Sequence, residues 1–272
     1  MQFAESSVLG PQTLGSGKVA WPVIRFAVSV FFAAICCAFM SRNANSILSE
    51  SDHFEAQRAE MVALQIRGRG VRSEQVLAAM ASTPRHEFVP ANQLSAAYSD
   101  NALLIGDGQT ISQPYVVAAM AEALSLTSSE RVLEIGGGSG YQAAILSTLA
   151  REVIAMELLP QLAEAARARL LRLGFSNVCV QQGDGSLGWG PGAPYDAILV
   201  AAAAPEIPPP LVDQLVEGGR LVIPVGGVEE QNLLRIVKCA GRVAQQTLFA
   251  CRFVPLRGFH GWQNGPQGTK QE

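Results

Sequence analysis

The chain has 272 residues, of which 49% are hydrophobic and 16% are charged. This composition excludes a disordered protein and supplies enough apolar side chains for one large α/β domain, or for a core with a smaller appendage. A formal net charge of −3 provides no basic field for nucleic acid, so no nucleic-acid partner is expected. The five cysteines follow neither zinc-ligand spacing nor a compact disulfide framework, so no metal site is expected.

The first part of the chain differs from the rest and is interpreted as an N-terminal extension over residues 1–51. Residues 26–40 form an apolar run that follows Lys18 and Arg25, as in a secretory signal. The run is short for a bilayer span, which needs about 20 residues, and no clear cleavage site follows it. Export or membrane contact through this segment is one interpretation. The other interpretations are an apolar helix that packs on the domain and an extension from an upstream start codon that is not used.

The next part of the chain shows a helical pattern on both sides of a turn-rich stretch. Residues 52–90 place apolar side chains at three- and four-residue spacing, which predicts two short amphipathic helices broken at residues 68–70. Residues 91–115 are polar and rich in turn residues. Apolar periodicity returns at residues 116–126 and predicts a further helix.

From residue 131 onward, strand and helix patterns alternate. We predict strand 131–135, helix 140–150, strand 152–156, helix 160–173, strands 177–181 and 195–200, helix 207–216 and strand 219–225. This order is typical of an α/β fold with a doubly wound, mostly parallel sheet. Apolar runs at 233–237 and 248–254 predict a C-terminal antiparallel strand pair. The domain is expected to cover residues 52–258, followed by a polar tail at 259–272.

A glycine-rich loop follows the first of these strands. Gly136, Gly138 and Gly140 let the backbone turn tightly and leave room for a ligand at the start of the next helix. The dinucleotide fingerprint requires another glycine at the position of Tyr141. The loop therefore favours a cofactor without phosphates, such as S-adenosylmethionine, over a dinucleotide.

Carboxylates at strand ends support a nucleoside cofactor. Glu157 ends the second strand, where a carboxylate accepts hydrogen bonds from ribose hydroxyls. Asp184 follows the third strand and is placed to accept from an adenine amino group. Glu134, on the strand before the glycine loop, and Gly185 complete the candidate cofactor-binding residues. For each carboxylate alone, a role in capping a turn or helix is the alternative.

Several short segments carry a family resemblance. They are Gly108-Gln-Thr-Ile-Ser-Gln-Pro-Tyr115, the glycine loop at 132–142, Gly183-Asp-Gly185, 203–208, 218–226, and the flanks at 58–67, Pro84-Arg-His-Glu-Phe-Val-Pro90 and 252–256. Together they resemble the protein-L-isoaspartate O-methyltransferase family over about residues 55–257. The glycine loop is shared with many methyltransferases, whereas the segment around Ser112 is close to diagnostic.

The resemblance implies a Rossmann-like class I methyltransferase fold and a repair reaction. A methyl group would pass from S-adenosyl-L-methionine to the free α-carboxylate of L-isoaspartyl residues in damaged proteins and peptides. Ser112 matches the active-site serine of the family, Thr110 is expected to assist it, and Asp100 to order the same loop. A carboxylate is already a nucleophile at neutral pH, so catalysis should depend on alignment. Without the resemblance, Ser112 would be interpreted as a helix N-cap.

Two other functions stay open at this point. One is a methyltransferase with the same cofactor and another acceptor, and the other is a non-catalytic domain that binds the nucleoside. The family implies a cytoplasmic location, because its cofactor is made in the cytosol, and the protein is expected to be a monomer. A periplasmic or membrane-tethered location is the alternative that the segment at 26–40 suggests.

Overall fold

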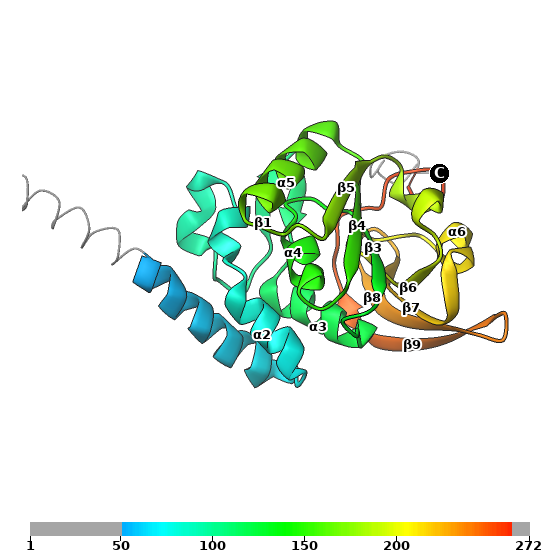
Figure 1. Ribbon diagram of the computed structural model, residues 1–272, viewed down its shortest axis with the longest axis horizontal. Coiled ribbons are helices and arrows are strands. Elements are labelled where there is room, and N and C mark those ends of the chain that lie inside the picture. The colour runs from blue at the N-terminus through cyan, green and yellow to red at the C-terminus, as the bar shows by residue number, and fades with distance from the viewer. Residues whose placement is uncertain (1–50, 263–272) are drawn as a thin grey trace, which may run out of the picture. The chain divides into compact units, whose positions relative to one another are not determined.

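A seven-stranded sheet forms the centre of the computed structural model, which describes residues 51–262. Its strand order is β5-β4-β3-β6-β7-β8-β9 (Figure 1). The strands are β3 (Arg131–Ile135), β4 (Glu152–Glu157), β5 (Val178–Gln182), β6 (Tyr195–Val200), β7 (Leu215–Gly226), β8 (Gln231–Cys239) and β9 (Arg242–Cys251). Strands β3 to β7 are parallel, and β8 and β9 are antiparallel to their neighbours. The predicted mostly parallel sheet with a C-terminal antiparallel pair is confirmed.

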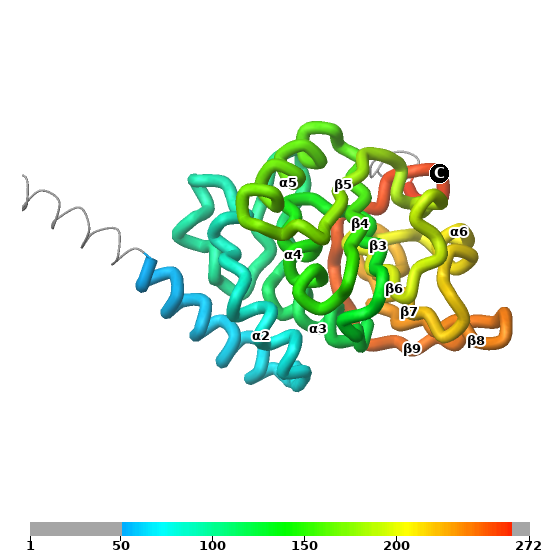
Figure 2. The backbone as a smooth tube through the Cα atoms, in the orientation of Figure 1, coloured from blue at the N-terminus to red at the C-terminus, as the bar shows by residue number. Residues whose placement is uncertain are grey.

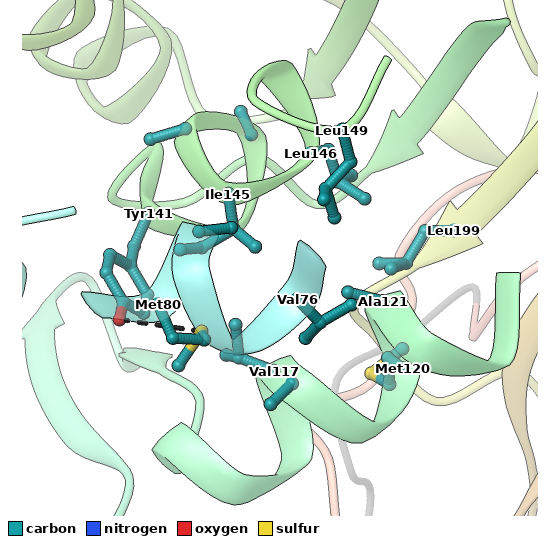
Figure 3. Close-up of a cluster of buried hydrophobic side chains, with 14 of the residues drawn as sticks. Val76, Met80, Val117, Met120, Ala121, Tyr141, Ile145, Leu146, Leu149 and Leu199 are labelled. Carbon is teal, nitrogen blue, oxygen red and sulfur yellow. Dashed lines mark hydrogen bonds between the residues drawn. The ribbon is translucent and has the colours of Figure 1, made fainter. Parts of the chain in front are cut away.

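Helices cover both faces of this sheet (Figure 1). They are the helical turns η1 (Met61–Ile66) and η2 (Arg67–Arg69), followed by α2 (Glu74–Ser82), α3 (Pro114–Leu124), α4 (Tyr141–Ser147), α5 (Pro160–Arg172) and α6 (Pro209–Asp213). The larger apolar core lies between α2 to α5 and one face of the sheet. Within it, Met80, Val117 and Ile145 come from three helices and lie together, and Leu199 of the sheet lies beside Ala121 (Figure 3).

Local sequence signals account for where these helices begin and end. The Ser73 hydroxyl accepts a hydrogen bond from the Val76 amide and caps α2. Proline stands at the first position of α3 and of α5, where its missing amide hydrogen costs nothing. The predicted break at residues 68–70 is confirmed, because η2 ends at Arg69 and its C-cap, Gly70, has a φ of +108°.

Some elements differ from the expectation. A short hairpin of β1 (Leu103–Gly106) and β2 (Gln109–Ile111) lies in the stretch that was expected to be turn-rich. Helix α6 is shorter than predicted and β7 starts earlier, because the chain joins the sheet as soon as Leu215 reaches Tyr195. Strand β9 begins at Arg242, ahead of the apolar run, since its exposed edge tolerates polar side chains.

After β9 the chain returns across the sheet. Pro255 pairs with Ala203, which follows β6, and the last described residues reach the loop after β5 (Figure 2). The predicted apolar segment at residues 26–40 lies outside the described residues. Within residues 51–262, no helix is both long and apolar enough to cross a membrane.

Candidate functional site

The glycine loop joins β3 to α4 and is held by the end of β4. The amides of Gly136 and Gly137 donate to the Met156 carbonyl at 2.9 and 3.0 Å. The Gly138 amide donates to one oxygen of Glu157 at 2.8 Å, in a backbone conformation (φ +51°) that favours glycine. The other Glu157 oxygen accepts from the Leu159 amide at 2.9 Å. The carboxylate therefore fixes the loop to the strand beside it.

A first pocket opens at this loop, at the carboxyl ends of β3, β4 and β6. The order of the parallel strands reverses between β3 and β6, and open α/β sheets bind ligands at such a point. The pocket offers about 610 Å³ of free space. Its lining includes Gln109, Thr110, Ile135, Gly136, Gly138, Met156, Glu157, Leu158, Leu159, Gly185, Ala201, Ala202, Val254, Pro255, Leu256 and Arg257. Five residues predicted from sequence are among them.

A second pocket adjoins the first. Thr110, Ala201 and Val254 line both pockets. The second pocket offers about 880 Å³ of free space, and its lining also includes Arg69, Asp100, Asn101, Ala102, Ser112, Gln113, Tyr115, Val116 and Phe249 to Phe253. A ligand in one pocket therefore lies directly beside a ligand in the other.

Of the two predicted catalytic residues, Thr110 lines both pockets and Ser112 lines the second. Because successive side chains of a strand point to opposite faces, buried Ile111 places Thr110 and Ser112 together on the pocket side. Helix α3 takes Gln113 as its N-cap, without a side-chain cap, so the alternative of Ser112 as an N-cap is wrong. Among residues 51–262 neither hydroxyl has a hydrogen-bond partner, and both are free to contact a ligand.

Charged and aromatic side chains form the outer wall of the second pocket. Arg69 forms an ion pair with Asp100 at 2.8 Å and lies over the Tyr115 ring, 3.8 Å from its centroid. The Asp100 carbonyl accepts a hydrogen bond from the Gln113 side chain at 2.9 Å. Asp100, which lies before the β1–β2 hairpin, thus binds Arg69 through its side chain and Gln113 through its backbone carbonyl.

Three of the candidate cofactor residues do not line the first pocket. Gly140 is the N-cap of α4 and packs against Leu170 of α5. Glu134 is fully buried in β3, neither of its oxygens has a partner among the described residues, and burial followed by the charge of Glu157 raises its pKa well above the usual range. Asp184 accepts hydrogen bonds from Ser186 and from the Phe259 amide.

Sequence reasoning missed several residues of the two pockets. Ala201 follows β6, where the strand order reverses. Because ligands bind at such reversals, this place in the sheet could have indicated Ala201 as a pocket residue. Val254 and Arg257 come from the returning C-terminal segment, whose path no local pattern predicts. Arg85 lies behind the second pocket and is completely buried, which a polar residue in a turn-rich sequence does not suggest.

Comparison with known proteins identifies the family. The profile of the Protein-L-isoaspartate(D-aspartate) O-methyltransferase (PCMT) family matches residues 56–260. The chain belongs to this family. A protein-L-isoaspartate O-methyltransferase of Methanoculleus marisnigri is 56% identical over 214 residues, which cover 79% of this chain and 97% of the relative. One from Rhodopseudomonas palustris is 54% identical and covers 79% and 89%.

Solved structures of the same family share the fold. A protein-L-isoaspartate O-methyltransferase superposes with a TM-score of 0.68 at 32% identity, covering 75% of this chain and 66% of that chain. A Plasmodium falciparum protein assigned to PCMT, solved in complex with S-adenosyl-L-homocysteine, has a TM-score of 0.63 at 25% identity, covering 74% and 98%. The class I methyltransferase fold expected from the sequence is confirmed.

Proposed function

We propose that this protein transfers a methyl group from S-adenosyl-L-methionine to the free α-carboxylate of L-isoaspartyl residues in damaged proteins and peptides. One observation carries the proposal beyond family membership. Two pockets meet at Thr110, Ala201 and Val254, so a methyl donor in the first pocket and a carboxylate in the second are within direct reach of each other.

The first pocket suits a nucleoside cofactor without phosphates. Of the described residues that line it, Arg257 alone carries a positive charge, which is too little for a pyrophosphate. Each Glu157 oxygen accepts one backbone hydrogen bond and retains lone pairs for ribose hydroxyls. S-adenosyl-L-methionine would supply an electrophilic methyl group on a sulfonium. The glycine loop and Glu157 would hold it.

The second pocket suits a carboxylate acceptor. At neutral pH an α-carboxylate is ionised, so no proton must be removed before its oxygen attacks the methyl carbon. The products are the methyl ester and S-adenosyl-L-homocysteine. Ser112 would donate a hydrogen bond to the carboxylate and align it, with Thr110 beside it, because a well-aligned approach supplies most of the required acceleration. Gly140, Glu134 and Asp184 would support the cofactor from behind its pocket.

Radiolabelled methyl transfer tests this function. The protein should label an isoaspartyl peptide and not its normal aspartyl isomer. Ser112→Ala should lower kcat/KM by about 10- to 100-fold, the usual loss for a hydrogen bond to a charged group, whereas Ser129→Ala on the exposed surface should change nothing. If protein that binds S-adenosyl-L-homocysteine labels neither peptide, the acceptor is another group or the domain only binds the nucleoside.

We also propose that the protein is cytoplasmic, since its cofactor is made in the cytosol, and that it is a monomer. The domain over residues 52–258, the tail at 259–272 and contact of residues 26–40 with a membrane stay predictions. Mass spectrometry of the N-terminus tests the location, because a mature chain that starts near residues 41–45 would indicate export.

A further inference from the structure

Arg85 is an unusual buried cation. It begins the helical turn η3 (Arg85–Phe88), and its side chain is completely buried. No carboxylate among the described residues forms an ion pair with it. Burying a charge without a counter-ion is costly, and burial accordingly lowers the pKa of Arg85. The hydrogen bonds of Arg85 must therefore offset part of the cost of burying its charge.

Those hydrogen bonds connect separate parts of the site. Arg85 Nε donates to the Ala97 carbonyl and Nη2 donates to the Ser112 carbonyl, both at 2.8 Å. Ala97 follows the turn η4 (Ala91–Ala96), and Ser112 follows β2 in the loop that lines the second pocket. One rigid group thus fixes the backbone on both sides of the β1–β2 hairpin.

The guanidinium provides a third connection, to an aromatic ring. Its central carbon lies 4.9 Å from the centroid of the Tyr141 ring. Tyr141 is the first residue of α4 and directly follows the glycine loop. Its hydroxyl also contacts the Met80 sulfur, so the ring is held within the core (Figure 3). Arg85 therefore links the Ser112 loop to α4, the helix that follows the glycine loop.

We propose that Arg85 is a positioning residue for methyl transfer, which sets the Ser112 loop relative to the first pocket. It touches neither pocket and acts through the Ser112 carbonyl. This inference rests on the proposed function, because the acceptor must align with the methyl donor. Lysine lacks the planar fork whose Nε and Nη2 each donate to one of the two carbonyls, so a lysine at this position holds them in a less fixed geometry.

The test compares Arg85→Lys with Arg235→Lys. Arg235 also donates to a backbone carbonyl, that of Ala123 at 2.7 Å, and lines neither pocket. We expect Arg85→Lys to raise KM for an isoaspartyl peptide by about tenfold and to lower kcat, with kcat normalised to the number of sites that bind S-adenosyl-L-homocysteine. The dissociation constant for S-adenosyl-L-homocysteine should stay within about twofold, and Arg235→Lys should leave all of these values unchanged.

The outcomes separate the inference from the proposed function. If the unmutated protein methylates the peptide and Arg85→Lys keeps its KM and normalised kcat, the positioning role is wrong and the proposed function stands. If the unmutated protein does not methylate the peptide, the function fails and the inference fails with it. A loss of folded protein with unchanged KM indicates a merely structural role and also overturns the inference.

A measurement on the unmutated protein keeps the inference testable if Arg85→Lys does not fold. The nuclear magnetic resonance signal of the Arg85 Nε–H should shift when an isoaspartyl peptide is added to protein saturated with S-adenosyl-L-homocysteine. The aspartyl isomer should not shift it. A signal that stays in place with both peptides overturns the positioning role.

Discussion

Glu134 and Glu157 lie on neighbouring strands and have opposite surroundings. Both Glu157 oxygens accept backbone hydrogen bonds at the edge of the first pocket. Glu134 is enclosed by the sheet and α-helices, without a partner for either oxygen among the described residues. A buried, unpartnered carboxylate favours its protonated form, so the pKa of Glu134 lies well above the usual range. Stability should therefore depend on pH at this residue.

Glu134→Gln should stabilise the protein at high pH and not at low pH. The folded chain keeps the Glu134 proton at pH values where the unfolded chain releases it, so stability falls as pH rises above about 4.5. Glutamine does not titrate and avoids this loss. We expect the variant to melt a few degrees higher than the unmutated protein at pH 8 and at the same temperature at pH 4.

Thermal unfolding followed by circular dichroism at both pH values measures the difference. Glu206→Gln, a change of the same kind at an exposed position, should melt at the same temperature as the unmutated protein at both pH values. An equal shift of the melting temperature at pH 4 and pH 8 would mean that titration of Glu134 is not the cause.

At the scale of elements, the first pocket depends on how the end of β3 meets the loop after β5. Gly185 in that loop lies against Ile135, the last residue of β3, and a Cβ atom there would come within 2.5 Å of an Ile135 methyl carbon. Both residues line the first pocket. The absence of a side chain at residue 185 therefore lets the loop after β5 lie close to the end of β3.

Gly185→Ala should destabilise the protein by about 1–3 kcal/mol, the usual cost of overpacking a dense site, and weaken binding of S-adenosyl-L-homocysteine. Gly190→Ala is the control, because nothing lies within 4 Å of a Cβ atom at that position. Urea denaturation and titration calorimetry measure the two effects. Equal stability of the two variants would show that the loop moves aside without cost.

The sequence predicted the elements that carry strong local signals. Strands β3 and β6 are mostly apolar, because parallel strands are buried on both faces, and their predicted bounds are confirmed. The β1–β2 hairpin was missed because Leu104 is exposed and its strands are short. The start of β9 was missed because Gln245 and Gln246 lie on an edge strand, where pairing with β8 and not apolar burial defines the strand.

At the scale of the whole molecule, the end of the described chain folds back onto the site. The Phe259 amide donates to Asp184, the His260 amide donates to Ser186, and the Trp262 ring donates to the Ala203 carbonyl. Residues just before this segment line the first pocket. The return of the chain therefore closes one side of that pocket.

Gly258→Ala should release this closure. A Cβ atom at residue 258 would collide with the Asp184 carboxylate, and its φ of +143° is strained for any other residue. We expect the Phe259 amide to exchange with deuterium at least about tenfold faster, and the affinity for S-adenosyl-L-homocysteine to fall, while exchange in β3 and β6 stays unchanged. Unchanged exchange at Phe259 would show that the segment is held by other contacts.

The site as a whole could be predicted only in part. The glycine loop, Glu157 and the Ser112 loop each carry a compact motif, and the structure brings them together at the two pockets. One hydrogen-bond partner of Asp184, the Phe259 amide, lies 75 residues further along the chain. No local pattern shows such a pairing, just as none shows that Arg85 is buried behind the Ser112 loop.

The second pocket has walls from distant parts of the chain. Arg69 and Ser112 precede the strands of the sheet in the chain, whereas Phe249 to Val254 belong to the end of β9, its last strand, and to the segment that follows. During translation, the parallel strands can assemble while this wall is still inside the ribosome. A nascent chain therefore acquires this wall of the second pocket last, and a product that terminates before β9 lacks it.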